Sequence, residues 1–588
     1  MGAAPEGTEW MEDLAPIRAT DWTRERARHL LDRAGFGGTP QEITRLASMT
    51  PEAAMRSLVD YQSIPDDALR PFQESGVFDP SLTEFPATRP AATRLAEKTG
   101  AAMGVEVKPS GDLRLQPVAN RFFFWLRATA LETRRLSNWW AERMLQTPRP
   151  LQEKMALFWH GHFATGAEKV RDYRKMQTQL ALFHREATGN FRDLLIGVAK
   201  DPAMLVFLDA GLNVKDAPNE NFGREVMELF TMGVGHYTEV DIREAARAFT
   251  GWTDDDLKFK VNPASHDNGI KTVLGYTGPL DGVEVLDIIL RQRVTSEHVA
   301  GRLYRFLVRE DISPAFQQRL GALLASGGFE IAPFLRTIFL SKDFYSQASV
   351  GTRIKGPAEL IVSTYRQLGL VDLPGVPDFN GASSELGQTL LNPPTVAGWA
   401  QGRAWITPGT LLARGNFARE VMFPDMISFT DPNLDPSSVV RLVNTRILQG
   451  MNVAAATASG PASTPAAGGD GEKMMAAGPA EQFNTRYATL KGWQEAVRKI
   501  RPILRTPAQF SLTDIVMVPG AETAGDAVDI LLDRFLSVPV DNGVRKMLVA
   551  FLEDQLGTSD IIRSRSYMEE PLRLLGHLIL STPEYQLA

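Results

Sequence analysis

The stretch LFWHGHF, from Leu157 to Phe163, places two histidines one residue apart among a tryptophan and two phenylalanines. The chain has only eight histidines in 588 residues, so this spacing draws attention. If Gly161 ends the preceding helix and the chain is extended here, His160 and His162 point the same way and could bind one zinc, copper or iron ion. The alternative is that the aromatic neighbours bury both imidazoles as core residues.

Glu153 lies on the same predicted helical face as His160. Pro150 is a favourable first residue of a helix, and seven residues separate Glu153 from His160, about two helical turns. Glu153 could therefore accept a hydrogen bond from His160 or join it at a metal ion.

A second candidate lies in the segment NENFGREVMELF. Asn219 is a suitable N-cap, and Glu225 and Glu228 then share one face of the helix, opposite an apolar face. Two carboxylates on one face can bind a cation or divide the roles of acid and base. The alternative is a solvated acidic face that pairs with arginines such as Arg224 and Arg243.

His266 and Asp267 lie in a polar turn, Ser265 to Gly269, and could swing toward a neighbouring site. We therefore predict a metal-dependent enzyme of hydrolytic type, in which His160, His162, His266 and Asp267 hold zinc, manganese or iron. Either glutamate could then activate the bound water, with Glu225 as the first choice. At least three of these six side chains should converge on one point. Arginines such as Arg224, Arg243 or Arg247 in the space between the two glutamates would instead indicate a structural ion-pair network.

The proline- and glycine-rich segment from Leu391 to Gly409 cannot form a regular helix and is predicted to be an ordered loop. Its tryptophans, Trp399 and Trp405, could bind substrate or a partner, because indole rings offer large rigid contact faces. They could equally pack on the helical core. The loop motivates a second hypothesis, a non-catalytic helical scaffold that binds a partner enzyme or an extracellular polymer.

A third hypothesis is a metal-free glycoside hydrolase. It needs two carboxylates about 5 to 10 Å apart across a cleft. Glu225 and Glu228, one helical turn apart, do not provide this arrangement unaided.

The fold class is predicted to be mainly α, because most segments read as amphipathic helices, for example Trp22 to Ala34 and Ser296 to Arg309. The exception is Leu257 to Gly278, a small β-hairpin or long loop. The expected organisation is a flexible N-terminus over 1–20, a main helical region with the candidate site over 21–452, a flexible low-complexity insertion over 453–482, and a C-terminal helical region over 483–588 that packs on the main region.

The composition excludes several classes of function. A net charge of −7 gives no field for nucleic acid, and the absence of cysteine excludes thiolate catalysis and iron–sulfur clusters. No nucleotide cofactor is expected. No apolar run is long enough for a membrane span, and the acidic N-terminus shows no export signal. The sequence as it stands favours the cytoplasm, or the periplasm or exterior if a leader has been removed.

Many segments, in order along nearly the whole chain, resemble blocks of the bacterial family catalogued as domain of unknown function 1800. They include HLLDRAGFGGTP, PLQEKMALFWHGHFATG, NENFGREVMELFTMGVGHYTE, IKGPAEL, PPTVAGWAQGRAWITPG and LILSTPEYQ. The resemblance implies a large, mostly helical bacterial protein without an established activity. It also implies an envelope or secreted role beside a second protein resembling the alkaline phosphatase and sulfatase superfamily. The chain departs from the family in its lack of a visible leader and in the insertion after Met451.

Overall fold

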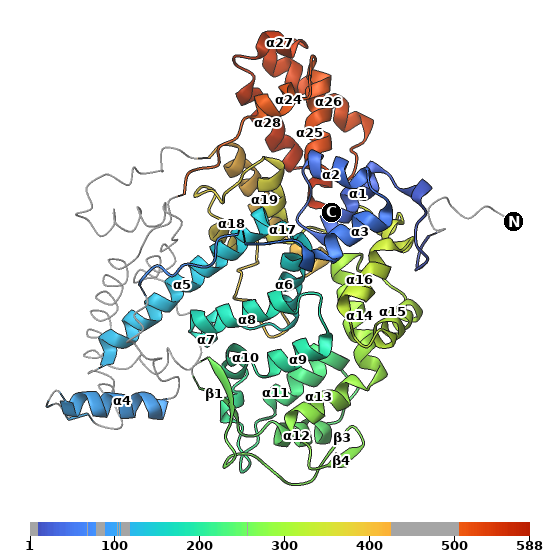
Figure 1. Ribbon diagram of the computed structural model, residues 1–588. Helices are drawn as coiled ribbons and strands as arrows, with labels where there is room; N and C mark the ends of the chain where they lie inside the picture. Colours follow the sequence, from blue (N-terminus) through green and yellow to red (C-terminus); the bar gives the residue numbers. More distant parts are fainter. Residues whose placement is uncertain are drawn as a thin grey trace.

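Figure 1 shows a computed structural model of the chain, which is built almost entirely of helices. The structure describes residues 10–67, 69–77, 89–102, 104, 106–107, 118–255, 257–424 and 505–588. The strands found in these ranges form two small antiparallel sheets of two strands each. The prediction of a mainly α fold is confirmed. None of the helices described is long and apolar enough to cross a membrane.

The N-terminal helices begin where the sequence supplies capping residues. Thr23 accepts a hydrogen bond from the Arg26 N–H at the start of α1 (Arg24–Ala34), which ends at Ala34, as predicted, and is followed by Gly35. Thr39 and Glu42 form a capping box at α2 (Pro40–Ala47). The other elements of this part are η1 (Ala19–Asp21), α3 (Pro51–Val59), η2 (Tyr61–Ser63), α4 (Arg89–Ala102) and α5 (Ala119–Gln146).

The stretch expected to be a flexible N-terminus is in part ordered. Ile17 is 2% exposed, and its N–H donates a hydrogen bond to the Leu340 carbonyl at 2.8 Å. An apolar side chain and a backbone bond to α16 (Ile331–Leu340) thus fix residues near 17, which the polar composition of the stretch had obscured.

The helix α6 (Pro150–His162) is central, since every residue from Leu151 to His162 is buried. It packs against α5, α1, α3 and α8 (Tyr173–Arg185). Gly161 does not end this helix. A Cβ at Gly161 would lie 3.4 Å from a ring carbon of Trp399, so the glycine lets the Trp399 ring approach the helix closely.

The middle of the chain continues with further helices and with the two small sheets. Asn219 is an N-cap, as predicted, and Thr238 forms a capping box with Asp241. The helices here are α7 (Ala167–Val170), α9 (Phe191–Ala199), α10 (Pro202–Phe207), η4 (Ala210–Leu212), α11 (Glu220–Glu225), the π-helix η5 (Val226–Met232), α12 (Glu239–Ala248), α13 (Gly282–Leu290), α14 (Arg293–Leu307) and α15 (Pro314–Ser326).

The segment predicted as one hairpin, Leu257 to Gly278, contributes to two. Strand β2 (Lys258–Val261) pairs with the preceding β1 (Trp252–Asp255), while β3 (Lys271–Val273) pairs with β4 (Tyr276–Gly278). The polar turn between β2 and β3 therefore separates the two hairpins, because each strand has a closer partner on its other side.

The C-terminal helices pack on the main region, and Figure 1 shows them together beside α1 and α2. α28 (Glu569–Leu580) contacts α19 (Pro408–Met422), and α25 (Ala524–Phe535) contacts α17 (Pro357–Gln367). The remaining elements are η6 (Asp343–Tyr345), α18 (Phe379–Glu385), η7 (Gly402–Trp405), α24 (Leu512–Met517), α26 (Asn542–Leu556), α27 (Ile561–Ser564) and η8 (Glu584–Gln586). The insertion expected over 453–482 lies outside the described residues.

Candidate functional site

His160 faces an aromatic core. Because α6 runs through Gly161, two steps of about 100° place His160 and His162 on opposite sides of the helix, and the extended geometry that would have aligned them does not occur. The His160 ring packs against Trp140, Phe183 and Trp399, with ring centroids 5.2 to 5.9 Å apart. Its Nε2 has no hydrogen-bond partner among the described residues. Burial lowers the pKa of His160 to about 3, so the ring is neutral at pH 7.

His162 is held on the other side of α6. Its Nε2 donates a hydrogen bond to the Phe230 carbonyl at 3.0 Å, and its ring contacts Phe158 and Phe163. Burial lowers the pKa of His162 well below its usual value, with Arg302 and His298 adding to the effect. His298 was missed by the sequence analysis, although its spacing of four from Arg302 puts both on one face of α14. The two imidazoles of the HGH pair thus lie in separate surroundings.

Glu153 does not bond to His160. Its carboxylate accepts hydrogen bonds from Trp140 Nε1 at 3.0 Å, His184 Nε2 at 2.7 Å and Arg143 Nε at 2.8 Å. Burial alone would raise the pKa of Glu153, but His184 and Arg143 outweigh it and the pKa is lowered. Glu153 is therefore the anion of a buried ion-pair network between α5, α6 and α8.

Glu225 and Glu228 are half-buried and lie where α11 passes into the π-helix η5. Tyr237 donates a hydrogen bond to Glu228 Oε2 at 2.5 Å. Burial, and next to it the charge of Glu228, raise the pKa of Glu225. Arg224 pairs instead with Glu220 and Glu239. A π-helix has more residues per turn than an α-helix, so a spacing argument at 100° per residue does not hold beyond Glu225.

His266 and Asp267 are engaged locally. His266 Nδ1 donates to the Thr250 carbonyl at 2.8 Å, and Asp267 Oδ2 accepts from Arg247 Nε at 2.8 Å. Arg247 also pairs with Glu244. Asp267 thus belongs to an ion-pair network with Arg247 and Glu244. Within the parts of the chain that the structure describes, no group of three or more His, Asp or Glu side chains could hold a metal ion, so the expected convergence is not found.

The two loop tryptophans are core residues. Trp399 is 8% and Trp405 6% exposed. The Trp399 ring lies against His160 and Gly161, and Trp405 lies against Gly356 and Gly387. Neither ring offers a free face on which a sugar or a partner could stack, because the glycines let both rings sink into the helical core.

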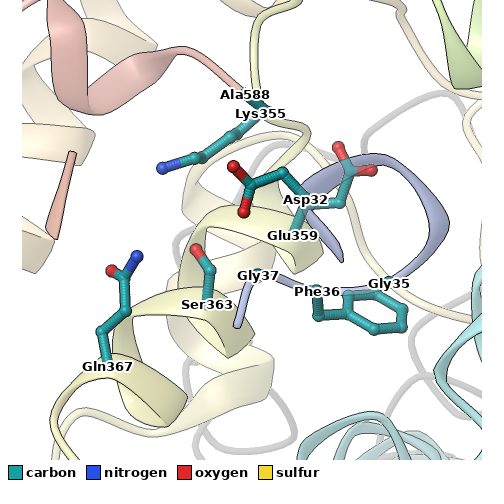
Figure 2. A pocket seen from close by; sticks show the side chains of 9 residues that line it. All are labelled: Asp32, Gly35, Phe36, Gly37, Lys355, Glu359, Ser363, Gln367 and Ala588. Carbon is teal, nitrogen blue, oxygen red and sulfur yellow. The ribbon is translucent and has the colours of Figure 1, made fainter. Parts of the chain in front are cut away.

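A small pocket, shown in Figure 2, lies where three distant parts of the chain meet: the loop after α1, helix α17 and the last residue. It has room for about one water-sized molecule. The side chains of Asp32, Lys355, Ser363 and Gln367 point into the same space. The lining is completed by Gly35, Phe36, Gly37, Glu359 and Ala588.

The polar groups of this pocket have unused bonding capacity. Lys355 Nζ makes one hydrogen bond among the described residues, to the Tyr585 carbonyl at 3.0 Å. Asp32 Oδ2 accepts from Ser537 at 2.7 Å, and no ion pair with a described cation is formed. Gln367 Oε1 is buried without a described partner. Burial lowers the pKa of Lys355 to about 8 and raises that of Asp32.

Buried cations lie near the pocket, and one of them, Lys355, lines it. Glu359 pairs with Lys154 and with Arg353, the latter at 2.9 Å, and these cations outweigh the effect of burial and lower its pKa to about 2. Five cations at most 7% exposed thus face two carboxylates, Asp32 and Glu359. A terminal carboxylate on Ala588 would make the ratio five to three. The cations are Arg33, Lys154, Arg353, Lys355 and Arg414.

The glycine-rich loop after α1 adds backbone donors. Phe36, Gly37 and Gly38 are buried, yet their N–H groups donate to no acceptor in the described part of the chain. Gly37 has φ +77°, and a Cβ there would lie 3.3 Å from the Ser363 Cβ. Nothing local in the sequence links this loop to Lys355, which lies far along the chain.

The family model described as "Protein of unknown function (DUF1800)" matches residues 29–587. The match covers all of the pocket lining except Ala588. No curated protein and no solved structure matches the chain.

Proposed function

The chain belongs to the DUF1800 family, whose description names no activity, and we propose from the geometry that it is a ligand-binding protein with its ligand site in the pocket between the Gly35–Gly38 loop and α17. The observation that carries the proposal is the convergence of Lys355, Asp32 and Gln367 on one space with bonding capacity unused. Buried polar groups are almost always satisfied, and a ligand can satisfy these.

The proposal keeps the binding hypothesis from the sequence but moves the site. Trp399 and Trp405, which the sequence suggested as the binding surface, are packed in the core. The polar side chains of the pocket have unused hydrogen-bonding capacity. The ligand would contact the N-terminal loop, the middle of the chain and the C-terminal end together. Binding would therefore stabilise the packing of these three parts on one another.

The hydrolase hypothesis has less support. Nucleophilic catalysis requires a nucleophile hydrogen-bonded to a base, but the Ser363 hydroxyl donates to the Leu360 carbonyl at 3.0 Å. Metal-dependent hydrolysis would use His160, His162 or His266, which contact separate parts of the core. A zinc, manganese or iron cofactor stays a prediction, and metal analysis of the purified protein tests it.

The test is ligand-observed NMR of the full chain against a library of small polar compounds, with Gln367→Leu as the pocket variant. Leucine keeps the approximate size of glutamine and removes the amide. Its Oε1 has no described partner and its Nε2 makes one long hydrogen bond, 3.5 Å, to the Phe535 carbonyl, so the fold should persist. The matched control is Gln555→Leu, the same change at an exposed position. We expect compounds whose binding is weakened by Gln367→Leu and is unchanged by Gln555→Leu. Hits that both variants bind equally would contradict the proposal.

A further inference from the structure

The unpartnered backbone donors near the pocket indicate what kind of group it takes. Buried N–H groups without an acceptor are rare in native proteins. Phe36, Gly37 and Gly38 are three buried residues in succession, and none of their N–H groups has an acceptor in the part of the chain that is described. Consecutive N–H groups in a glycine-rich turn form a concave site for an anion. Gly37 is required in this turn because its φ is +77°.

The charges around the pocket favour the same class of ligand. The five buried cations exceed the two carboxylates of Asp32 and Glu359, and a terminal carboxylate on Ala588 would still leave an excess of two. An excess of buried charge of one sign is costly unless an opposite charge is nearby. Glu359 is already bonded to Lys154 and Arg353 and forms no ion pair with Lys355, although the charges of Asp32 and Glu359 both favour the ammonium form of Lys355.

We propose that the group bound in the pocket is a small oxyanion, held by the ammonium group of Lys355 and by N–H groups of the loop Phe36 to Gly38, of which Phe36 and Gly37 line the pocket. The inference rests on the proposed function and names its ligand class. Because the pocket has room for about one water molecule, it would admit one oxygen of a carboxylate, with the rest of the acid outside it, more readily than the larger phosphate or sulfate.

Asp32 gives this site a dependence on pH. Figure 2 shows its carboxylate beside the Lys355 ammonium group, so an incoming anion would face a like charge. Burial already raises the pKa of Asp32, and a bound anion would raise it further, so that Asp32 takes up a proton and donates it in a hydrogen bond to the anion. Other charged groups near Asp32 and Lys355 are Arg28, Arg33, Arg414 and Glu359.

The test is isothermal titration calorimetry of the full chain with acetate, phosphate, sulfate and, as a neutral isostere, acetamide. We expect acetate to bind and acetamide not to bind. Binding of phosphate or sulfate in place of acetate would support an oxyanion site and would contradict the choice of a carboxylate as its ligand. Lys355→Gln should weaken acetate binding at least about tenfold, the effect of losing a hydrogen bond to a charged group. The control Lys546→Gln removes the same charge from an exposed position and should change nothing.

Asp32→Asn should change the affinity for acetate in the opposite direction. It keeps the proposal testable if Lys355→Gln fails to fold. It keeps an acceptor for Ser537 and removes the negative charge, so it should bind acetate more tightly than the parent chain. Proton uptake on binding, measured in buffers of different ionisation enthalpy, should disappear in this variant. Weaker or unchanged binding would overturn the role of Asp32 and with it the oxyanion assignment.

The two proposals fail in different ways. If no anion binds but a neutral compound does, and Gln367→Leu weakens it, the oxyanion inference is wrong while the ligand site stands. If the pocket variants change the binding of neither anions nor neutral compounds, both proposals are wrong.

Discussion

Replacing Glu153 by glutamine should destabilise the protein strongly, because Glu153 is the buried anion of a structural network and not a ligand of a metal ion. The Glu153 side chain is fully buried and accepts from Trp140, His184 and Arg143. Glutamine has one acceptor oxygen and would turn an amide N–H group toward donors. Loss of one partner from a buried ion pair costs about 3 to 5 kcal/mol.

The structure places the expected value near the lower end of that range. Arg143 retains a second partner, Asp66, at 3.1 Å, and the Arg143 and His184 side chains are each 12% exposed, so both hydrogen-bond donors keep some contact with solvent. We therefore expect the free energy of unfolding to fall by about 3 kcal/mol at pH 7. The pKa of Glu153 is lowered in the folded state, so its contribution is present above the unfolded value of 4.5 and is lost as the pH falls below it.

The assay is urea unfolding, monitored by circular dichroism and tryptophan fluorescence. The free energy is derived from the first transition, because a chain of this size need not unfold in two states. The control is Glu186→Gln, which removes an anion from a surface pair with Arg185, 66% exposed, and should cost less than about 1 kcal/mol. The difference between the parent chain and Glu153→Gln should shrink at acid pH. Equal effects of the two variants, or a difference independent of pH, would refute the network.

Four further outcomes follow from the contacts. His160→Phe should cost less than about 1.5 kcal/mol by urea unfolding, because the imidazole packs as an aromatic ring with Nε2 unpartnered in the described structure; a large loss would show a polar role. Asp267→Asn should loosen the turn at its pair with Arg247, seen as faster hydrogen exchange there, and unchanged exchange would contradict the pair's role. Acetate affinity should fall as the pH rises through about 8, since Lys355, with a pKa of about 8, loses its charge; a constant affinity in calorimetry would argue against Lys355 as the anion's partner. EDTA should leave the melting temperature unchanged, because the described residues form no three-ligand site, whereas a drop together with stoichiometric metal would favour the hydrolase.

Local signals in the sequence were sufficient for much of the helical fold. The caps at Asn219 and Thr238 and the helix start at Pro150 were predictable because a capping side chain or a proline acts on the residues next to it. The hairpins were predicted less well. β-Propensity indicates that a segment forms a strand but not which strand it pairs with. The strand Lys258–Val261 pairs with the strand before it in the chain.

The candidate site could not be predicted in the same way. The expected alignment of His160 and His162 depended on Gly161 ending the helix, whereas packing of Trp399 on that glycine overrides its weak helix propensity. The pocket depends on Asp32 and Lys355, which only the tertiary fold brings together. No spacing rule relates positions so far apart, and each residue taken alone reads as an ordinary charged side chain.

Hydrogen exchange of the backbone amides in the loop after α1 tests the central claim most directly, because it observes the proposed donors themselves. With acetate present at a concentration that saturates binding, the amides of Phe36, Gly37 and Gly38 should exchange more slowly than in the free protein, while those around Lys546 should not change. Protection of the loop that is lost in Lys355→Gln would support an anion site built from these groups. Unchanged exchange at the three amides, with acetate bound, would contradict the account.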